Sequence, residues 1–247
     1  LKTPPIGINF HGMNMFLQNN IFIFVLILQK YEIPINYCMP IYKTISSEGQ
    51  TTIYIWKIEE SFEELSEGLV LTDNSMRRLS GMKSELHQKG FLSVRRLLKH
   101  AGYEDSNLYY NDFGRPFLND DKHISITHSF EFAAVLISEQ EAGVDIEKNR
   151  EKIVNIQHRF VNTEVDSLSD EDLVKQLTVI WGAKESMYKT YPYGGLSFHD
   201  HIGINPFLFA DGRSSGRVIF ENWKREYGIK FEFLKEGFTL VHALVKP

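Results

Sequence analysis

Four charged side chains, in two separate stretches of the sequence, have the types and spacing of a site for a metal ion and phosphate. Asp145 and Glu147 stand two residues apart in a short apolar run, so they point to the same side if the run is a strand. Glu185 and Lys189 stand four residues apart in a stretch typical of a helix, and therefore lie one turn apart on one face. Three carboxylates that can converge beside a lysine suit Mg²⁺ bound to a phosphate-bearing substrate, because Mg²⁺ combines a few carboxylates with waters and substrate oxygens.

The two stretches resemble the signature of the 4′-phosphopantetheinyl transferases, of the larger, surfactin-synthetase-activating type. Residues 143–147 read Gly-Val-Asp-Ile-Glu, close to the family's Gly-(Ile/Val)-Asp-(Ile/Val/Leu)-Glu, and residues 181–189 contain its Trp-x-x-Lys-Glu-(Ser/Ala)-x-x-Lys. Upstream, Gly-Arg-Pro at 114–116 and Ser-Ile-Thr-His-Ser at 125–129 are similar to two further family elements. Thr127 stands where the family usually has Ser, and it keeps the hydroxyl.

The resemblance covers about residues 50–245 and implies a reaction. The 4′-phosphopantetheine arm of coenzyme A would move to a serine of an apo acyl or peptidyl carrier protein, leaving adenosine 3′,5′-bisphosphate. Mg²⁺, or Mn²⁺ in its place, would be held by Asp145, Glu147 and Glu185 and would bridge the diphosphate. Glu185 is also the best-placed group to accept the serine proton, so its division between metal and proton stays open. Fatty-acid, polyketide and nonribosomal peptide synthesis are equally open as the pathway.

The resemblance also implies contacts to coenzyme A. Lys189 and His128 would add positive charge at the diphosphate, with Thr127 and Arg115 beside them. A basic segment after residue 75 would supply cations for the 3′-phosphate. The candidates in that segment are Arg77, Arg78 and Lys89.

The elements that would position these residues alternate between strands and helices. Alternating apolar residues predict strands at 52–58, 124–128, 132–137, 143–147, 216–220, 229–233 and 239–245. Apolar periodicity and capping residues predict helices from Ser61, over 75–100 with a break near Gly81 or Gly90, over 154–160, and from Ser169 to about Tyr191. This order indicates an α+β protein. The resemblance implies two similar α+β halves, residues 39–142 and 143–247, related by a pseudo-twofold axis with the active site between them.

Composition limits the remaining possibilities. The 247-residue chain is 43% hydrophobic, so it can bury a sizeable core, and its net charge of −5 argues against a general nucleic-acid binder. The single cysteine, Cys38, excludes an internal disulfide framework and fits a reducing compartment, so we expect a cytoplasmic protein. The apolar run 21–28 is too short to span a membrane. We expect no membrane partner, and a monomer, since two halves in one chain would suffice.

Residues 1–38 precede the resemblance, and Met39 follows them. Our hypothesis is that much of this segment is an N-terminal extension outside the native catalytic protein.

Other interpretations remain open at this point. Taken singly, the acids could be a solvated strand end, and Glu185 with Lys189 a surface ion pair contributing about 0.3–0.5 kcal/mol. The chain could be another Mg²⁺-dependent enzyme acting on phosphoanhydrides, such as a hydrolase, or a non-catalytic carrier-binding protein. His199 and His201 could bind zinc, but they lack further ligands in the sequence, so we favour a solvated loop.

Overall fold

The computed structural model describes residues 41–162, 165 and 169–247. The hypothesis about residues 1–38 therefore lies outside the described residues. No helix within the described ranges is long and apolar enough to cross a membrane.

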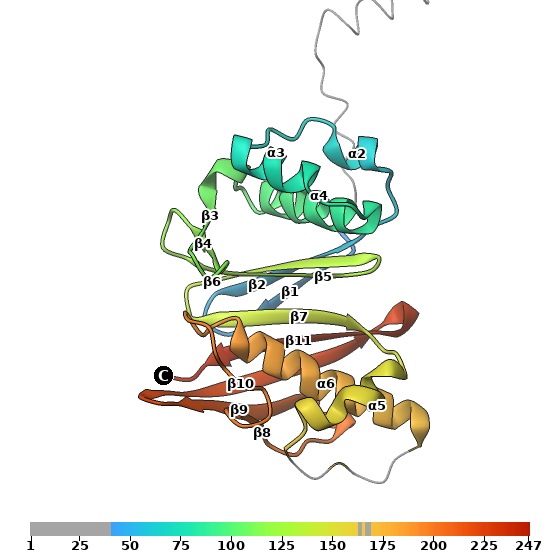
Figure 1. Cartoon of the computed structure of the whole chain (residues 1–247), viewed down its shortest axis with the longest axis vertical. Coiled ribbons are helices and arrows are strands. Elements are labelled where there is room, and N and C mark those ends of the chain that lie inside the picture. The colour runs from blue at the N-terminus through green and yellow to red at the C-terminus, as the bar shows by residue number, and fades with distance from the viewer. Residues whose placement is uncertain (1–40, 163–164, 166–168) are drawn as a thin grey trace, which may run out of the picture. The chain divides into compact units, whose positions relative to one another are not determined.

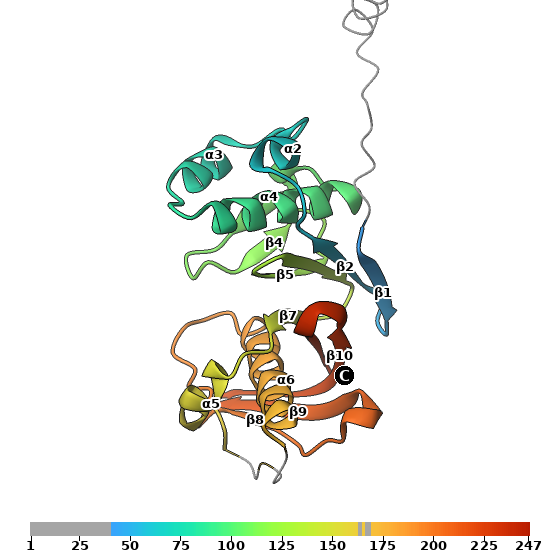
Figure 2. The same cartoon turned by 90° about the vertical axis from the view of Figure 1, so that its right-hand side faces the viewer.

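The first half of the described chain forms a four-stranded antiparallel sheet covered by helices (Figure 1). Its strands, in spatial order, are β1 (Lys43–Ser47), β2 (Thr51–Lys57), β6 (Phe132–Ser138) and β5 (His123–Ser129). Its helices are α2 (Phe62–Ser66), α3 (Asp73–Ser80) and α4 (Glu85–His100). Helix α4 runs along one face of the sheet, and α2 and α3 lie outside it (Figure 2).

Local sequence explains where these helices begin and end. Ser61 and Glu64 form the predicted capping box at the start of α2. The predicted break in the long helical segment occurs at Gly81, the C-cap of α3. Gly90 does not break the helix; it lies buried within α4, where a Cβ atom would stand 3.0 Å from His128 Nδ1. The glycine thus lets the helix approach the strand that carries His128.

A short hairpin follows α4 and brings the Gly-Arg-Pro turn toward the same region. It joins β3 (Leu108–Tyr110) to β4 (Pro116–Leu118). Gly114 has a φ of +80°, a left-handed conformation that favours glycine, which explains this residue in the turn.

The second half is a five-stranded antiparallel sheet with one long helix packed on it. The strands, in spatial order, are β7 (Ala142–Lys148), β11 (Phe238–Val245), β10 (Trp223–Leu234), β9 (Arg213–Phe220) and β8 (Ile202–Ile204). The helices are α5 (Lys152–Ile156), which is shorter than predicted, and α6 (Asp170–Tyr188), which Ser169 caps as predicted. Helices with antiparallel sheets confirm the predicted α+β class.

The packing of α6 on β7 sets the spacing of the site. Val144 and Ile146 are fully buried in the core, as the alternation predicted, so Asp145 and Glu147 face the other side of the strand. A Cβ atom on Gly143 would stand 1.9 Å from Ser186 O, so only glycine permits this close approach of strand and helix. Glu185 is thereby brought beside the acids of β7.

Candidate active site

A cavity of about 540 Å³ collects most of the residues that the sequence predicted for the site. The four charged residues Asp145, Glu147, Glu185 and Lys189 line it. The predicted coenzyme A contacts that also line it are Arg78, Arg115, Thr127 and His128. The other two predicted contacts, Arg77 and Lys89, are not among the described residues that line the cavity. Strands of both sheets, helix α6 and the β3–β4 turn therefore contribute to one site.

Asp145 is the centre of the charged cluster. The residue is 4% exposed, and its Oδ1 accepts hydrogen bonds from Lys189 Nζ at 2.8 Å and from Thr127 Oγ1 at 3.1 Å. Lys189 also donates to Val144 O at 2.8 Å. Because Lys189 is the C-cap of α6, its side chain reaches the strand, and the ion pair it forms is with Asp145. In the structure Lys189 therefore pairs with Asp145 of β7 rather than with Glu185 on the helix surface.

The other two acids are held in an environment that disfavours their charge. Burial, followed by the nearby charge of Asp145, raises the pKa of Glu185 to about 7. The pKa of Glu147 is raised for the same two reasons, while a hydrogen bond from Ser129 opposes the shift. A bound cation would reduce the repulsion among the three carboxylates and stabilise their charged forms.

The donor set fits a divalent cation that binds oxygen, although it is not preassembled. Within the described ranges, no group of three or more His, Cys, Asp and Glu side chains is close enough to hold a metal ion as it stands. Asp145 Oδ2, however, is buried without a hydrogen-bond partner among the described residues, and its neighbours Glu147 and Glu185 carry raised pKa values. A hard cation such as Mg²⁺ would satisfy that oxygen and relieve the repulsion.

His128 stands at the side of the cavity formed by α4. Its ring lies against Gly90, and its pKa is lowered by desolvation of the ring, then by the charges of His87 and Lys189. A neutral imidazole at this position can donate one hydrogen bond and accept another.

The basic segment 77–96 divides into different roles. Arg78 lines the cavity, with its guanidinium 4.2 Å from the centre of the Tyr110 ring. Lys89 does not line the cavity; the pKa of the nearby Glu64 of α2 is lowered first by hydrogen bonds from Ser61 and least by the charge of Lys89. Arg95 is 4% exposed and pairs with Asp105 at 3.0 Å, so it is a structural residue.

Arg115 is also committed within the protein. Its Nη1 donates to Thr190 O at 2.7 Å, and its Nη2 donates to Glu141 Oε1 at 3.1 Å. The side chain thus braces the β3–β4 turn against the end of α6, and the predicted contact to coenzyme A stays a prediction.

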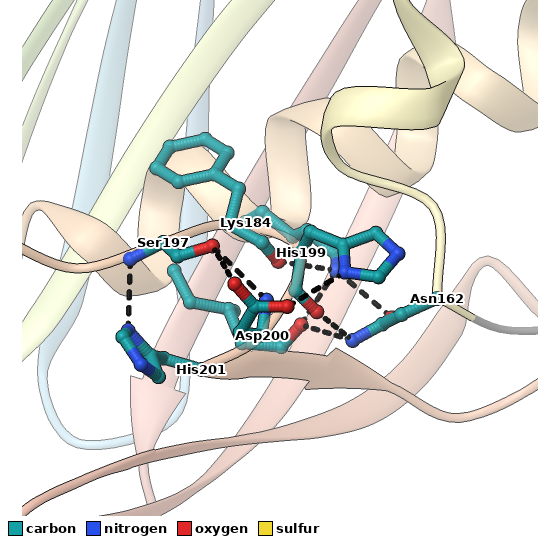
Figure 3. A network of polar contacts seen from close by, with 8 residues as sticks. Asn162, Lys184, Ser197, His199, Asp200 and His201 are labelled. Carbon is teal, nitrogen blue, oxygen red and sulfur yellow. Dashed lines mark hydrogen bonds and ion pairs between the residues drawn. The ribbon is translucent and has the colours of Figure 1, made fainter.

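Lys184 is an anchor that our sequence analysis missed. The side chain is fully buried, and Nζ donates to Asn162 Oδ1 at 3.0 Å and to Phe198 O at 2.7 Å (Figure 3). Burial lowers its pKa to about 8. Lys184 fixes α6 to the loop at 197–202, which orients the adjacent Glu185. A lysine within an otherwise apolar helix stripe was the available signal.

The same loop contains His199 and His201, the two histidines considered for zinc binding. His199 Nδ1 bonds Asp200 Oδ1 at 2.8 Å, and His201 Nδ1 accepts a hydrogen bond from Ser197 N at 2.8 Å (Figure 3). These polar contacts hold the loop at 197–201, and the preference for a loop over a zinc site stays a prediction.

The family model that matches this chain is described as the 4′-phosphopantetheinyl transferase superfamily, over residues 141–244. This part of the chain is similar to that superfamily. It contains β7, α6 and the strands through most of β11, and so all four charged residues of the cluster. The family predicted from the motifs is confirmed.

The 4′-phosphopantetheinyl transferase superfamily also supplies a similar curated protein. The chain is 28% identical over 144 residues to 4′-phosphopantetheinyl transferase gsp of Aneurinibacillus migulanus. The match covers 56% of this chain and 58% of the relative, so it spans little more than half of either protein.

Proposed function

We propose that this protein transfers the 4′-phosphopantetheine arm of coenzyme A to a serine of an apo acyl or peptidyl carrier protein, with adenosine 3′,5′-bisphosphate as the second product. The observation that carries the proposal is the meeting of Asp145, Glu147, Glu185 and Lys189 at one cavity, on a segment of the transferase superfamily. The charged cluster without the family match, or the family match without the cluster, would allow other functions.

The charges of the cavity suit a diphosphate. Asp145, Glu147 and Glu185 would hold Mg²⁺, or Mn²⁺ in its place, which would neutralise the diphosphate as charge moves onto the leaving phosphate. Lys189 and His128 face the same space and would donate hydrogen bonds to phosphate oxygens. Arg78 is the cation of the basic segment best placed for the 3′-phosphate, because it lines the cavity, while Arg95, which also lines it, is paired with Asp105.

Glu185 is our candidate to accept the serine proton. A general base works best when its pKa lies near the working pH, and without a bound cation burial raises the pKa of Glu185 to about 7. A cation bound directly to this carboxylate would lower its pKa, so the base role requires that Glu185 contact the metal through water or not at all. The proton would pass to the carboxylate directly or through a water, and the serine oxygen would attack the phosphorus of the pantetheine phosphate.

The proposal includes an architecture of two similar halves, residues 39–142 and 143–247. Each sheet carries one long helix, α4 on the first and α6 on the second, which supports the division. A single chain would then contain the whole site, and we propose a monomer in the cytoplasm.

The test is the mass of an apo carrier protein after incubation with the protein, coenzyme A and Mg²⁺. Transfer adds the mass of one phosphopantetheine arm and releases adenosine 3′,5′-bisphosphate. A phosphoanhydride hydrolase would consume coenzyme A without changing the carrier. A carrier-binding protein without activity would leave both unchanged.

A further inference from the structure

Strands β5 and β7 are neighbours without being partners in a sheet. Each stands at an edge of its own sheet, and the described strands show no backbone ladder between them. The unpaired N–H groups of β7 are instead satisfied by side chains. Val144 N donates to Ser125 Oγ at 3.0 Å, and Ile146 N donates to Thr127 Oγ1 at 3.3 Å. Alternate residues of β5 thus present hydroxyls to β7, as the period of two requires.

The Thr127 hydroxyl and the next hydroxyl along β5, that of Ser129, each donate to an acid of the charged cluster. Thr127 Oγ1 donates to Asp145 Oδ1 at 3.1 Å, and Ser129 Oγ donates to Glu147 Oε2 at 3.0 Å. The hydroxyl of Thr127 has one proton and accepts from a backbone N–H, so its proton is directed to the carboxylate. Each acid of β7 therefore has its own hydroxyl donor, two residues apart on both strands.

We infer that Thr127 and Ser129 are positioning residues, whose hydroxyls fix the orientation of Asp145 and Glu147 for metal binding. The Thr127 hydroxyl has no second proton to donate to a phosphate, which changes the role that the sequence predicted for it. The inference rests on the proposed function, because it assumes that the two acids bind the cation.

The expected effects follow from the role of such donors at metal sites. Loss of a side chain that orients a metal-binding carboxylate typically lowers metal affinity about 10–100-fold. Thr127→Val replaces the hydroxyl with a methyl group and keeps the shape of the side chain. Ser129→Ala removes the hydroxyl of the smaller serine side chain. Thr127→Ser restores the hydroxyl.

Ser125 provides a matched control within the same strand. Its hydroxyl accepts from Val144 N as that of Thr127 does from Ile146 N, but no bond from it to a carboxylate is found among the described residues. Ser125→Ala should therefore lower stability toward urea about as Thr127→Val does, and leave metal affinity unchanged.

The experiment measures Mn²⁺ binding to the full chain by the electron paramagnetic resonance of free Mn²⁺, with and without coenzyme A and without carrier. We expect at least about tenfold weaker binding for Thr127→Val and Ser129→Ala, and near wild-type binding for Thr127→Ser and Ser125→Ala. A separate turnover assay with carrier should show a smaller change in the KM for coenzyme A.

Three results would overturn the inference. The first is unchanged Mn²⁺ affinity in Thr127→Val with a raised KM for coenzyme A, which would indicate a phosphate contact. The second is an equal loss of affinity in Ser125→Ala, and the third is a wild-type protein that binds no Mn²⁺. The proposed function fails separately if the Mn²⁺ affinities of the wild type and the variants follow the expected order but the wild type modifies no carrier.

Discussion

The two oxygens of Asp145 are in different states. Oδ1 already accepts from Lys189 and Thr127, while Oδ2 is buried and lacks a partner among the described residues. A buried carboxylate oxygen without a partner is costly, so its persistence needs a reason in function. Lys189 Nζ pairs with Asp145 Oδ1 at 2.8 Å, and in the proposed function the same ammonium would also bind a phosphate oxygen.

The first prediction concerns Lys189. Lys189→Ala should lower kcat by about 10²-fold and change coenzyme A affinity less, because the charge acts mainly as the leaving phosphate becomes more negative. Lys189→Arg should recover only part of kcat, since a planar guanidinium does not replace a compact ammonium. Turnover at saturating carrier, together with calorimetry of coenzyme A, measures both. Wild-type turnover in Lys189→Ala would remove this residue from the site.

The second prediction separates two bases that the sequence could not distinguish. Arg78→Ala should raise the KM for coenzyme A about tenfold, as expected for loss of a charged hydrogen bond, and should have little effect with a 3′-dephospho analogue. Lys89→Ala should leave both KM values near the wild type, because Lys89 is not among the residues that line the cavity. Equal effects of the two substitutions would contradict the assignment of Arg78 to the 3′-phosphate.

At the scale of residues, the sequence predicted those features of the site that depend only on a local motif or on the alternation of a strand. The common side of Asp145 and Glu147 followed from the period of a strand. The partner of Lys189 did not, because it depends on where α6 ends relative to β7. The buried roles of Lys184 and Arg95 were also missed, since their partners lie outside the helices that carry them.

At the scale of elements, α4 and β5 meet through Gly90. The distance of 3.0 Å from a Cβ atom at this position to His128 Nδ1 leaves no room for a side chain unless the ring moves. The strands and helices themselves were largely predictable from period and caps. Gly90 was treated as a possible break, because sequence alone does not distinguish a glycine that ends a helix from one that admits a neighbour.

The third prediction tests this contact. Gly90→Ala should change the free energy of unfolding by no more than about 1 kcal/mol, since alanine favours the helix while the contact opposes it. It should nevertheless lower kcat/KM for coenzyme A, because the ring of His128 is displaced. In a His128→Ala background, Gly90→Ala should have no further kinetic effect. The same loss in both backgrounds would show that Gly90 acts through some other group.

At the scale of the whole described chain, polar contacts join strands of the two sheets on the side of β1. Lys43 pairs with Glu232 at 2.7 Å, and Lys230 pairs with Glu48 at 2.9 Å. Near them His242 is 5% exposed, with Ser47 Oγ 3.3 Å from its Nε2. Burial, followed by the charge of Lys230, lowers the pKa of His242 to about 4.

The fourth prediction follows from this histidine. Between pH 6.5 and about 4 the unfolded chain binds a proton at His242 and the folded chain does not, so stability falls as the pH falls through this window. The loss should be at most roughly 3 kcal/mol. Urea unfolding at pH 7 and 4.5 should show a smaller loss in His242→Gln than in the wild type. Equal losses would mean that His242 contributes nothing to acid sensitivity.

The central claim is that the acids at the cavity carry out transfer to a carrier protein. The most direct measurement compares the mass of an apo carrier after incubation with coenzyme A, Mg²⁺ and one of three proteins: wild type, Asp145→Asn, or Glu171→Gln, an exposed change at the start of α6. We predict that the carrier gains one phosphopantetheine arm with the wild type and Glu171→Gln, and none with Asp145→Asn although it remains folded. Complete modification of the carrier by Asp145→Asn would contradict the account.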